Sequence, residues 1–250
     1  MVMDFTFFAL AIPAVVFAGV SKGGFGSGAA FAATPLLALI LEPGAAIGLM
    51  LPLLMLMDVS ALRPYWRQWD WPHARALIIG AVPGVMLGGA LYSIAKPDLF
   101  RLLIGIVAIS FVAFQGGRAL GWISPARRPL TSVVGLFAGV VAGFTSFISH
   151  AGGPPVAVYL LSHGLSKTAF QATTVITFWI INLLKFGPYL ALGIFTQETL
   201  FADLLLAPVA VFGVWLGVKF HFKLSERWFF LLTYVFLTLT GTKLIWDALT

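Results

Sequence analysis

The sequence contains no cysteine among its 250 residues, which excludes disulfide bonds, thiolate metal sites and cysteine nucleophiles. Charge is scarce as well, because only 10% of the residues are Asp, Glu, Lys or Arg, against roughly 25% in an average soluble domain. With four scattered histidines and no cluster of carboxylates, we expect no metal site, no cofactor and no catalytic residue. The longest polar connection, residues 63–74, leaves no room for a soluble domain.

Hydrophobic residues make up 60% of the chain, and Phe alone contributes 23 of them. The mean hydropathy is +1.00. A soluble fold of this length has too little interior to hide that much apolar surface, so a water-soluble enzyme is excluded. The apolar stretches are long and continuous, whereas a β-barrel would show short alternating segments. The sequence therefore predicts an all-α polytopic membrane protein.

Eight apolar stretches are long enough to cross a bilayer, which takes about 20 residues in a helix. These predicted spans are residues 4–20, 43–62, 75–95, 99–120, 130–148, 168–193, 199–219 and 227–247. Two further stretches, 28–41 and 154–164, are too short for a full span, and each follows a Gly-rich break. We predict eight long transmembrane helices and two short broken or hairpin helices.

The two halves of the chain resemble each other at an offset of 124–128 residues. Ala18-Gly19 corresponds to Ala142-Gly143, Pro83 to Pro208, and Asp58 to Asn182. The order of segments is also shared: a long helix, a Gly-rich break, a short helix and three long helices. An internal duplication follows, with repeats 1–125 and 126–250 in one membrane domain.

The placement of the cations predicts how the two repeats are oriented. If each Gly-rich break is a hairpin turn, ten of the fifteen Lys and Arg residues fall on one side of the membrane: Arg63, Arg67, Arg75, Arg118, Arg127, Arg128, Lys167, Lys219, Lys223 and Arg227. The opposite side receives three: Lys96, Arg101 and Lys243. Cation-rich loops face the cytoplasm. We therefore expect inverted-topology repeats, with loops 63–75, 118–128 and 219–227 cytoplasmic and both termini outside. The net charge of +6 is an orientation signal, and no nucleic-acid partner is expected.

Glycines repeat every fourth residue in three of the predicted helices. The series are Gly80, Gly84 and Gly88, then Gly135, Gly139 and Gly143, and finally Gly213 and Gly217. Small residues at this spacing let two helix backbones approach closely inside a membrane. We interpret these glycines as packing residues of a helical bundle.

The two Gly-rich breaks are the strongest candidates for a binding site. They read Ser21-Lys22-Gly23-Gly24-Phe25-Gly26-Ser27-Gly28 and Ser149-His150-Ala151-Gly152-Gly153-Pro154-Pro155. Unwound backbone at membrane depth is tolerated only where it is buried in protein or lines a wet cavity. Inverted symmetry would bring both breaks together near the bilayer midplane.

The chemistry of the breaks suits an anion. Glycines let backbone N–H groups converge on a ligand, and the short helices are expected to begin near Gly28 and Pro155 with their positive ends towards the cavity. A Lys is costly at such a depth, which a simple hairpin turn does not explain. The predicted substrate-binding residues are Ser21, Lys22, Gly23, Gly24, Phe25, Gly26, Ser149, His150, Gly152, Gly153 and Pro154.

Three further polar residues lie within predicted helices and are candidates for gating or coupling. Lys185 is a substrate or gating cation, or else it pairs with a carboxylate or reaches towards the interface. Asp58 is a counter-ion of Lys185 or Lys22, or alternatively of Arg63 near the end of its helix. Asn182 lies beside Lys185 and corresponds to Asp58 in the repeat.

The breaks also carry a family resemblance. The stretch from Gly19 to Gly28, with Pro35 downstream, resembles the first signature of the sulfite exporter TauE/SafE family. Gly152-Gly153-Pro154-Pro155 followed by Tyr159-Leu160-Leu161 is similar to its second signature. The resemblance extends over essentially the whole chain and implies transport of small anions or organosulfur compounds, such as sulfite and sulfonates, across the bacterial inner membrane. Members are often described as eight-helix proteins, whereas two short segments bring the total here to ten.

We therefore predict a secondary transporter for a small anionic organosulfur substrate, working by alternating access between the two repeats. His150 is a candidate proton-coupling group, because an unperturbed histidine has a pKa of about 6.5. An anion channel of the same architecture is the main alternative. A serine hydrolase using Ser146 or Ser149 with a histidine is a third one, although adjacent Ser149 and His150 have poor geometry for a dyad. Besides substrate and lipid bilayer, a homodimer is compatible with the sequence.

Overall fold

The computed structural model describes residues 3–25, 29–123, 129–220 and 226–250, and helices are the only regular secondary structure among these residues. Eight of its helices are long and apolar enough to cross a membrane. They are α1 (Phe5–Val20), α3 (Pro43–Leu62), α4 (Trp71–Ile94), α5 (Pro97–Ala119), α6 (Ser132–Ser149), α8 (Lys167–Ala191), α9 (Gln197–Phe220) and α10 (Glu226–Leu249). Two short helices, α2 (Ala33–Leu37) and α7 (Gly153–Leu161), complete the bundle. The predicted multi-pass, all-α architecture is confirmed.

Several helices begin where a side chain caps their free N–H groups. Asp4 Oδ1 accepts from the Phe7 N–H at 2.9 Å, and Ser166 Oγ accepts from the Ala169 N–H at 3.1 Å. Asp70 caps α4 in the same way. Because of this cap, α4 begins at Trp71, four residues earlier than the hydropathy pattern indicates.

The first Gly-rich break differs from the sequence prediction. Ser21–Phe25 continues α1 as a π-helical turn, a wider turn than that of an α-helix. The Ser21 N–H bonds to Ala18 O and Phe17 O within the helix. The next segment is a 3-10 turn, Ala30–Ala32, and α2 is only five residues long. The short helix predicted within 28–41 is present but shorter than expected, over Ala30–Leu37; Gly26, Ser27 and Gly28, where its N-terminal end was expected, lie outside the described residues.

The second break matches the prediction. Helix α6 ends at Ser149, and His150 follows in the left-handed conformation at φ 56°, which is uncommon for a residue other than glycine. Its N–H and that of Ala151 bond back to the last turn of α6, at 3.0 Å to Ser146 O and 3.2 Å to Thr145 O. Helix α7 then begins at Gly153 with two prolines in its first turn, where missing N–H groups cost nothing.

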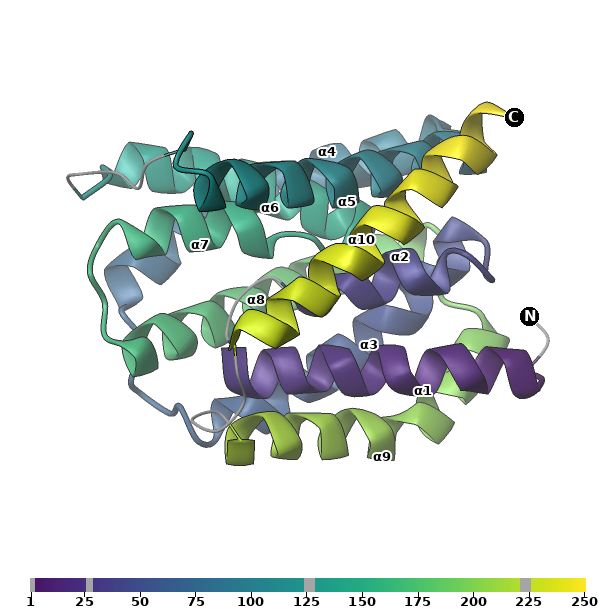
Figure 1. Ribbon diagram of the computed structural model, residues 1–250, viewed down its shortest axis with the longest axis horizontal. Helices are drawn as coiled ribbons and strands as arrows, with labels where there is room; N and C mark the ends of the chain where they lie inside the picture. Colours follow the sequence, from purple (N-terminus) through teal and green to yellow (C-terminus); the bar gives the residue numbers. More distant parts are fainter. Residues whose placement is uncertain (1–2, 26–28, 124–128, 221–225) are drawn as a thin grey trace.

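The start of α1 and the end of α10 lie at the same end of the molecule, on the right in Figure 1. The connections 63–70 and 162–166 lie at the opposite end, together with the C-terminal ends of α5 and α9. Helix α1 therefore runs away from the end at which the termini lie, and α6 runs towards it. This opposition is the one expected of inverted repeats.

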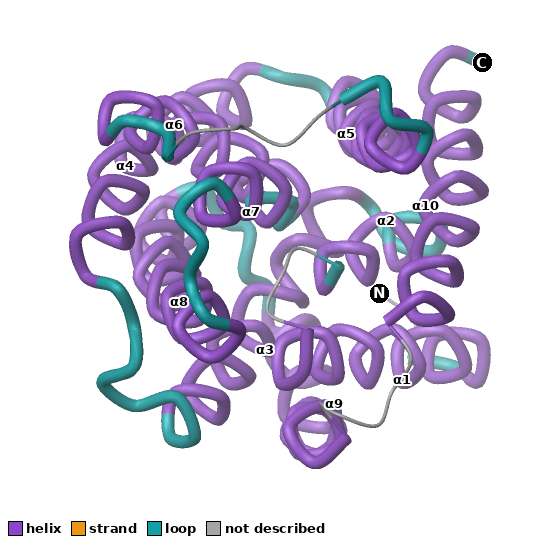
Figure 2. Tube along the Cα trace, turned by 60° about the vertical axis from the view of Figure 1, so that its left-hand side comes forward, coloured by secondary structure: helices purple, strands orange, loops and turns teal. Residues whose placement is uncertain are grey.

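The packing of the helices has the same symmetry. Helix α4 packs on α6 and α8, while α9 packs on α1 and α3, and the pairs α5–α10 and α3–α8 also contact each other. Figure 2 shows α4 beside α6 and α5 beside α10. The counterparts in the two halves are α1 and α6, α3 and α8, α4 and α9, and α5 and α10. When each helix is replaced by its counterpart, the same set of contacts results. The arrangement is consistent with the predicted duplication.

The repeated glycines lie where the backbones of these pairs are closest. A Cβ on Gly84 would be 2.1 Å from the Val140 carbonyl oxygen of α6, and one on Gly143 would be 2.3 Å from the Ala81 oxygen of α4. Across the α1–α9 contact, a Cβ on Gly217 would be 2.4 Å from the Val20 oxygen. The predicted packing role is confirmed, because only glycine permits these separations.

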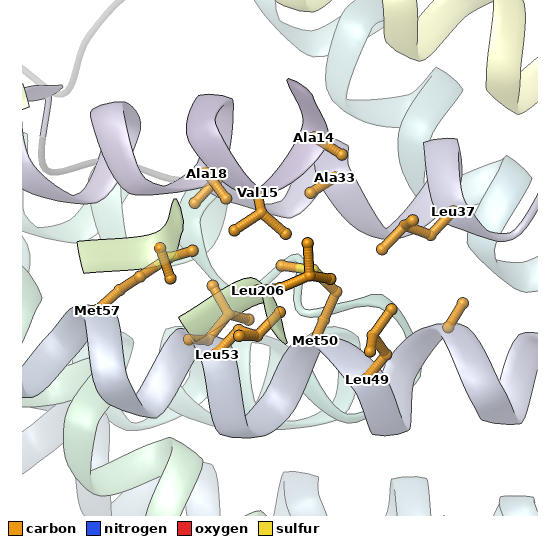
Figure 3. Close-up of a cluster of buried hydrophobic side chains, with 14 of the residues drawn as sticks. Ala14, Val15, Ala18, Ala33, Leu37, Leu49, Met50, Leu53, Met57 and Leu206 are labelled. Atoms are coloured by element: carbon orange, nitrogen blue, oxygen red, sulfur yellow. The ribbon is translucent and has the colours of Figure 1, made fainter. Parts of the chain in front are cut away.

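The largest hydrophobic cluster lies between α1, α2, α3 and α9. Figure 3 shows Val15 and Ala18 of α1 pointing towards Met50 and Met57 of α3, with Leu206 of α9 between the helices. All five side chains are buried. This cluster supports the two helical segments that carry Lys22 and Asp58, and it thereby positions the polar groups described next.

Candidate functional site: a charged interior

Polar side chains from four elements meet in the apolar interior. Lys22 of the π-helical turn forms an ion pair with Asp58 of α3. The second oxygen of Asp58, Oδ2, accepts from Asn182 Nδ2 of α8 at 2.7 Å. Asp58 is 1% exposed, so its charge depends on these partners. Of the pairings that the sequence left open for Asp58, the structure shows the one with Lys22.

Lys185 of α8 is fully buried in the same region. Its Nζ donates to the Ser146 carbonyl oxygen and to Ser146 Oγ, both at 3.0 Å, and contacts His150 Nδ1 at 2.7 Å. These acceptors satisfy its three donors, but none carries a negative charge. No carboxylate of the described residues lies within ion-pair distance of Lys185.

The contacts of His150 determine its tautomer. Nε2 lies 3.0 Å from the carbonyl oxygen of Ile47, which accepts and cannot donate, so Nε2 carries a proton. Nδ1 faces the Lys185 ammonium, so it accepts. The ring is therefore neutral and fixed between α3 and α8. Its left-handed backbone is one of the strained conformations that occur at functional sites.

The contacts in this interior pair two basic side chains with one acidic side chain. With Lys22 and Lys185 protonated and Asp58 ionised, the charges sum to +1. A buried charge without a counter-ion costs several kcal/mol, even after structural relaxation. A bound monovalent anion would remove this cost.

A cavity of about 40 Å³ lies inside this cluster. Its polar wall consists of Ser21, Lys22, Asp58, Ser146, His150, Thr174 and Asn182, with Gly153 at the start of α7. The Ser21 hydroxyl is buried and has no hydrogen-bond partner among the described residues. Since one water needs roughly 10–15 Å³, the space suits a small ion or a few waters.

A larger vestibule of about 450 Å³ is lined by residues from the C-terminal end of α5 and the start of α8, which lie at the end of the molecule opposite the termini (Figure 1). Its wall includes Arg118 and Lys167 together with the aromatic rings of Phe111, Phe114, Phe170 and Phe230. Gly153 lines both the vestibule and the small cavity. Gln171 of the vestibule also donates to the Lys22 carbonyl oxygen at 2.7 Å. The vestibule therefore leads to the charged interior from one side.

The path towards the other end is closed by a hydrophobic cluster. Tyr189 of α8 and Phe147 of α6 are buried there, with ring centroids 4.8 Å apart. The Tyr189 hydroxyl donates to the Phe147 carbonyl oxygen at 2.6 Å. Ile47, Leu51 and Ile181 pack around them. This apolar cluster therefore covers the side of the site towards the termini, whereas the vestibule adjoins its other side.

The structure brings together only part of the predicted site. Ser21, Lys22, His150, Gly153, Asp58 and Asn182 line the cavity, and Lys185 contacts two of its wall residues. Gly24 and Pro154 line the vestibule instead. The other described members of the prediction serve local packing: Gly23 against Val214 of α9, Gly152 against Ala142 and Phe178, and Ser149 by donating to Thr145 O. Phe25 belongs to the π turn but its side chain, like Gly26, lies outside the described part.

Sequence reasoning missed Ser146 and Tyr65 as parts of the site. The Tyr65 hydroxyl donates to the Gly23 carbonyl oxygen at 3.0 Å and holds the π turn in place; burial raises the pKa of Tyr65, which keeps it a donor. Ser146 had a signal in the sequence, because it corresponds to Lys22 at the same offset of 124 residues that relates Asp58 to Asn182. When two equivalent residues of a two-fold repeat contact each other, they lie at the two-fold axis. Asp58 and Asn182 are such a pair.

The other histidines lie away from this site. His73 and His163 have ring centroids 3.9 Å apart, at the junction of α4 and α7, and His73 Nδ1 also contacts Asp70 at 2.6 Å. Both side chains are half-buried. His221 lies outside the described residues.

The charged interior lies between the two signature stretches, and comparison with known families agrees with this arrangement. The family model described as sulfite exporter TauE/SafE matches residues 11–244. The chain belongs to the sulfite exporter TauE/SafE family. This membership confirms the resemblance of the two breaks and assigns the chain to a family of multi-pass membrane transport proteins. No curated protein and no solved structure matches this TauE/SafE chain.

Proposed function

We propose that this protein is a secondary transporter that moves a small anion, such as sulfite or a sulfonate, across the inner membrane by alternating access. The observation that carries the proposal is the net charge of +1, with both lysines protonated and Asp58 ionised, around a small cavity. In a low-dielectric interior such a charge attracts an anion strongly, and an intramembrane ionisable residue marks a substrate path by default.

The geometry supplies the parts that anion binding needs. Lys22 lines the cavity and is oriented by Asp58, while the unpartnered Ser21 hydroxyl is free to donate. Helix α7 begins at the cavity wall and has no side-chain cap. Pro154 and Pro155 carry no N–H, so the Gly153 N–H and the positive end of the helix complete the anion-binding wall. Lys185 contacts Ser146 and His150 of the cavity wall and, when protonated, contributes a positive charge that no carboxylate compensates among the described residues.

Closure at one end favours a carrier over a channel. The Tyr189–Phe147 cluster separates the cavity from the end at which the termini lie, whereas the vestibule leads to the other end. Rocking of the two repeats about the contact between Asp58 and Asn182 would exchange open and closed ends. Efflux stimulated by substrate on the opposite side would support the carrier; flux without counterflow would indicate a channel.

The hydrolase alternative finds no support in these contacts. His150 binds Ile47 O and Lys185, and its ring makes no hydrogen bond to Ser146 or Ser149 among the described residues. Lys185 reaches the Ser146 hydroxyl, but its other donors are also satisfied.

Lys185→Met provides the sharpest test of the proposal. Removing a buried charge without a counter-ion is expected to preserve or raise thermal stability, while uptake of sulfite or methanesulfonate into proteoliposomes falls by roughly tenfold or more, the factor that corresponds to about 1.4 kcal/mol. The control is Lys243→Met, because Lys243 pairs with Asp247 at the surface. Unchanged transport in Lys185→Met would contradict the assignment of the site.

A further inference from the structure

A second ionisable group lies within the bundle and takes no part in the site above. Asp203 of α9 is 7% exposed, and both of its carboxylate oxygens are buried without a hydrogen-bond partner among the described residues. It lines a cleft of about 330 Å³ between α3 and α9. An ionised carboxylate there would be strongly unfavourable, because nothing solvates or pairs it.

The surroundings of Asp203 select the kind of ligand it can bind. The other residues of the cleft are hydrocarbon: Pro52, Leu53 and Leu56 of α3, with Leu200, Leu204 and Ala207 of α9. A metal cation such as Ca²⁺ or Mg²⁺ needs about six oxygen ligands, and this cleft offers the two oxygens of one side chain. A proton needs only one of them.

The charged groups on the neighbouring elements are already engaged elsewhere. Helix α1 carries no titratable residue, α3 carries Asp58, and the π turn carries Lys22, which pairs with Asp58. On α9 itself, Glu198 precedes Asp203 by more than a turn and Lys219 lies near the far end of the helix. The protonation of Asp203 is therefore governed by its apolar burial.

Asp203 is mechanically connected to the anion site through two elements. Helix α3 presents Leu53 to the cleft and the adjacent Leu54 to the cavity. Helix α9 contacts the π turn directly, since a Cβ on Gly23 would be 2.3 Å from the Val214 carbonyl oxygen. A change in the α3–α9 contact would thus shift both partners of the Lys22–Asp58 pair.

We propose that Asp203 is a proton-binding site that couples anion transport to a proton moving in the same direction. This coupling rests on the proposed function. With the anion bound and Asp203 protonated, the interior charges sum to zero. They also sum to zero with the site empty and Asp203 ionised, since the +1 of the site is then balanced. The two mixed states carry a net charge, and a charged interior resists the conformational change. The cycle therefore carries anion and proton together.

The variant Asp203→Asn resembles the permanently protonated state and separates the steps of this cycle. The anion-loaded form stays neutral, so counterflow exchange of methanesulfonate in proteoliposomes is expected to remain near the wild-type rate. The empty form keeps its +1, so uptake driven by an acidic exterior is expected to fall by roughly tenfold or more, within the usual range of coupling between two sites. Methanesulfonate is used because it stays a monoanion over the pH range.

The controls are Asp98→Asn, which removes an exposed surface carboxylate paired with Arg101, and Asp203→Glu, which keeps a titratable group. Both are expected to retain uptake driven by the pH gradient. Gradient-driven accumulation in Asp203→Asn equal to that of the wild type would overturn the coupling. The coupling would also be overturned if both variants, Asp203→Asn and Asp203→Glu, lost counterflow exchange and gradient-driven uptake to the same extent.

Proton binding itself is measured without transport. Infrared titration of the reconstituted protein is expected to show the carbonyl stretch of a protonated, buried carboxylic acid, which disappears as the pH is raised and is missing in Asp203→Asn. An identical spectrum in that variant would overturn the proton site. If the wild type carries no methanesulfonate, the proposed function fails with that probe, while the infrared titration still decides whether Asp203 binds a proton.

Discussion

Asp58 bonds to both sides of the interior through the two oxygens of one carboxylate. Lys22 contacts Oδ1 from the first half of the chain, and Asn182 donates to Oδ2 from the second half. The group therefore connects the two halves at the point where their equivalent positions meet. Removing one partner of a buried ion pair typically costs about 3–5 kcal/mol, because the other charge stays buried and unpaired.

The variant Asp58→Asn tests this account at the level of a single residue. It raises the interior charge from +1 to +2, so we expect the free energy of unfolding to fall by about 3–5 kcal/mol without anions. Added methanesulfonate or sulfite should then raise the melting temperature more than it does for the wild type, because anion binding to the folded state stabilises it. Thermal unfolding in detergent measures both effects.

The matched control is Asp98→Asn at the surface, where ion pairs are worth about 0–1 kcal/mol. It should change neither the stability by more than that amount nor the response to anions. An Asp58→Asn protein as stable as the wild type, or one indifferent to anions, would show that Asp58 does not compensate Lys22.

At the scale of elements, two close helix contacts determine where the charged segments lie. Helix α4 approaches α6 through Gly80, Gly84, Gly139 and Gly143, and α9 approaches α1 through Gly19, Gly213 and Gly217. Helices α1 and α6 end in the π turn and in His150, respectively. The glycine contacts therefore set the positions of Lys22 and Ser146 on opposite sides of the cavity.

Adding one methyl group at such a contact should push the helices apart. For Gly84→Ala we expect a loss of about 1–3 kcal/mol, since the new Cβ would lie 2.1 Å from backbone. Gly187→Ala is the control, because nothing lies within 4 Å of its added Cβ and alanine favours a helix interior by roughly 0.5–1 kcal/mol. Denaturation of the purified protein gives the two values; equal losses would argue against a close α4–α6 contact.

At the scale of the whole molecule, the two ends carry unequal numbers of cations in the sequence. At the end where the termini lie, Arg101 pairs with Asp98 and Glu42, and Lys243 pairs with Asp247. The opposite end carries the larger number of cations. By the positive-inside rule, this difference predicts that the termini lie outside.

The absence of cysteine makes this orientation directly testable. Single cysteines in place of Trp122, which is 81% exposed, and of Thr250 at the C-terminus leave every charge unchanged. In intact cells, a membrane-impermeant maleimide is expected to label Thr250→Cys, and to label Trp122→Cys only after permeabilisation. The reverse pattern would invert the predicted topology.

How much of this could be read from the sequence differs between segments. The ends of the α3 span matched because hydropathy falls sharply at Pro43 and after Leu62. The start of α4 was placed too late, because the Asp70 cap extends it through polar residues. The first break was wrong in its local structure: glycines signal a possible turn, but here they serve the approach of α9 and the helix simply widens.

By itself, the sequence determined that this chain spans the membrane with eight long helices, that its halves correspond, and that Lys22 and Lys185 depart from the pattern of the other cations. The hydropathy pattern, the repeat and the placement of charges are properties of the sequence, so they can be recognised without the tertiary structure. Only the tertiary structure decided that Asp58 pairs with Lys22, that Lys185 has no carboxylate partner among the described residues, and that Asp203 is buried alone. Those contacts join helices far apart in the chain, and packing alone brings them together.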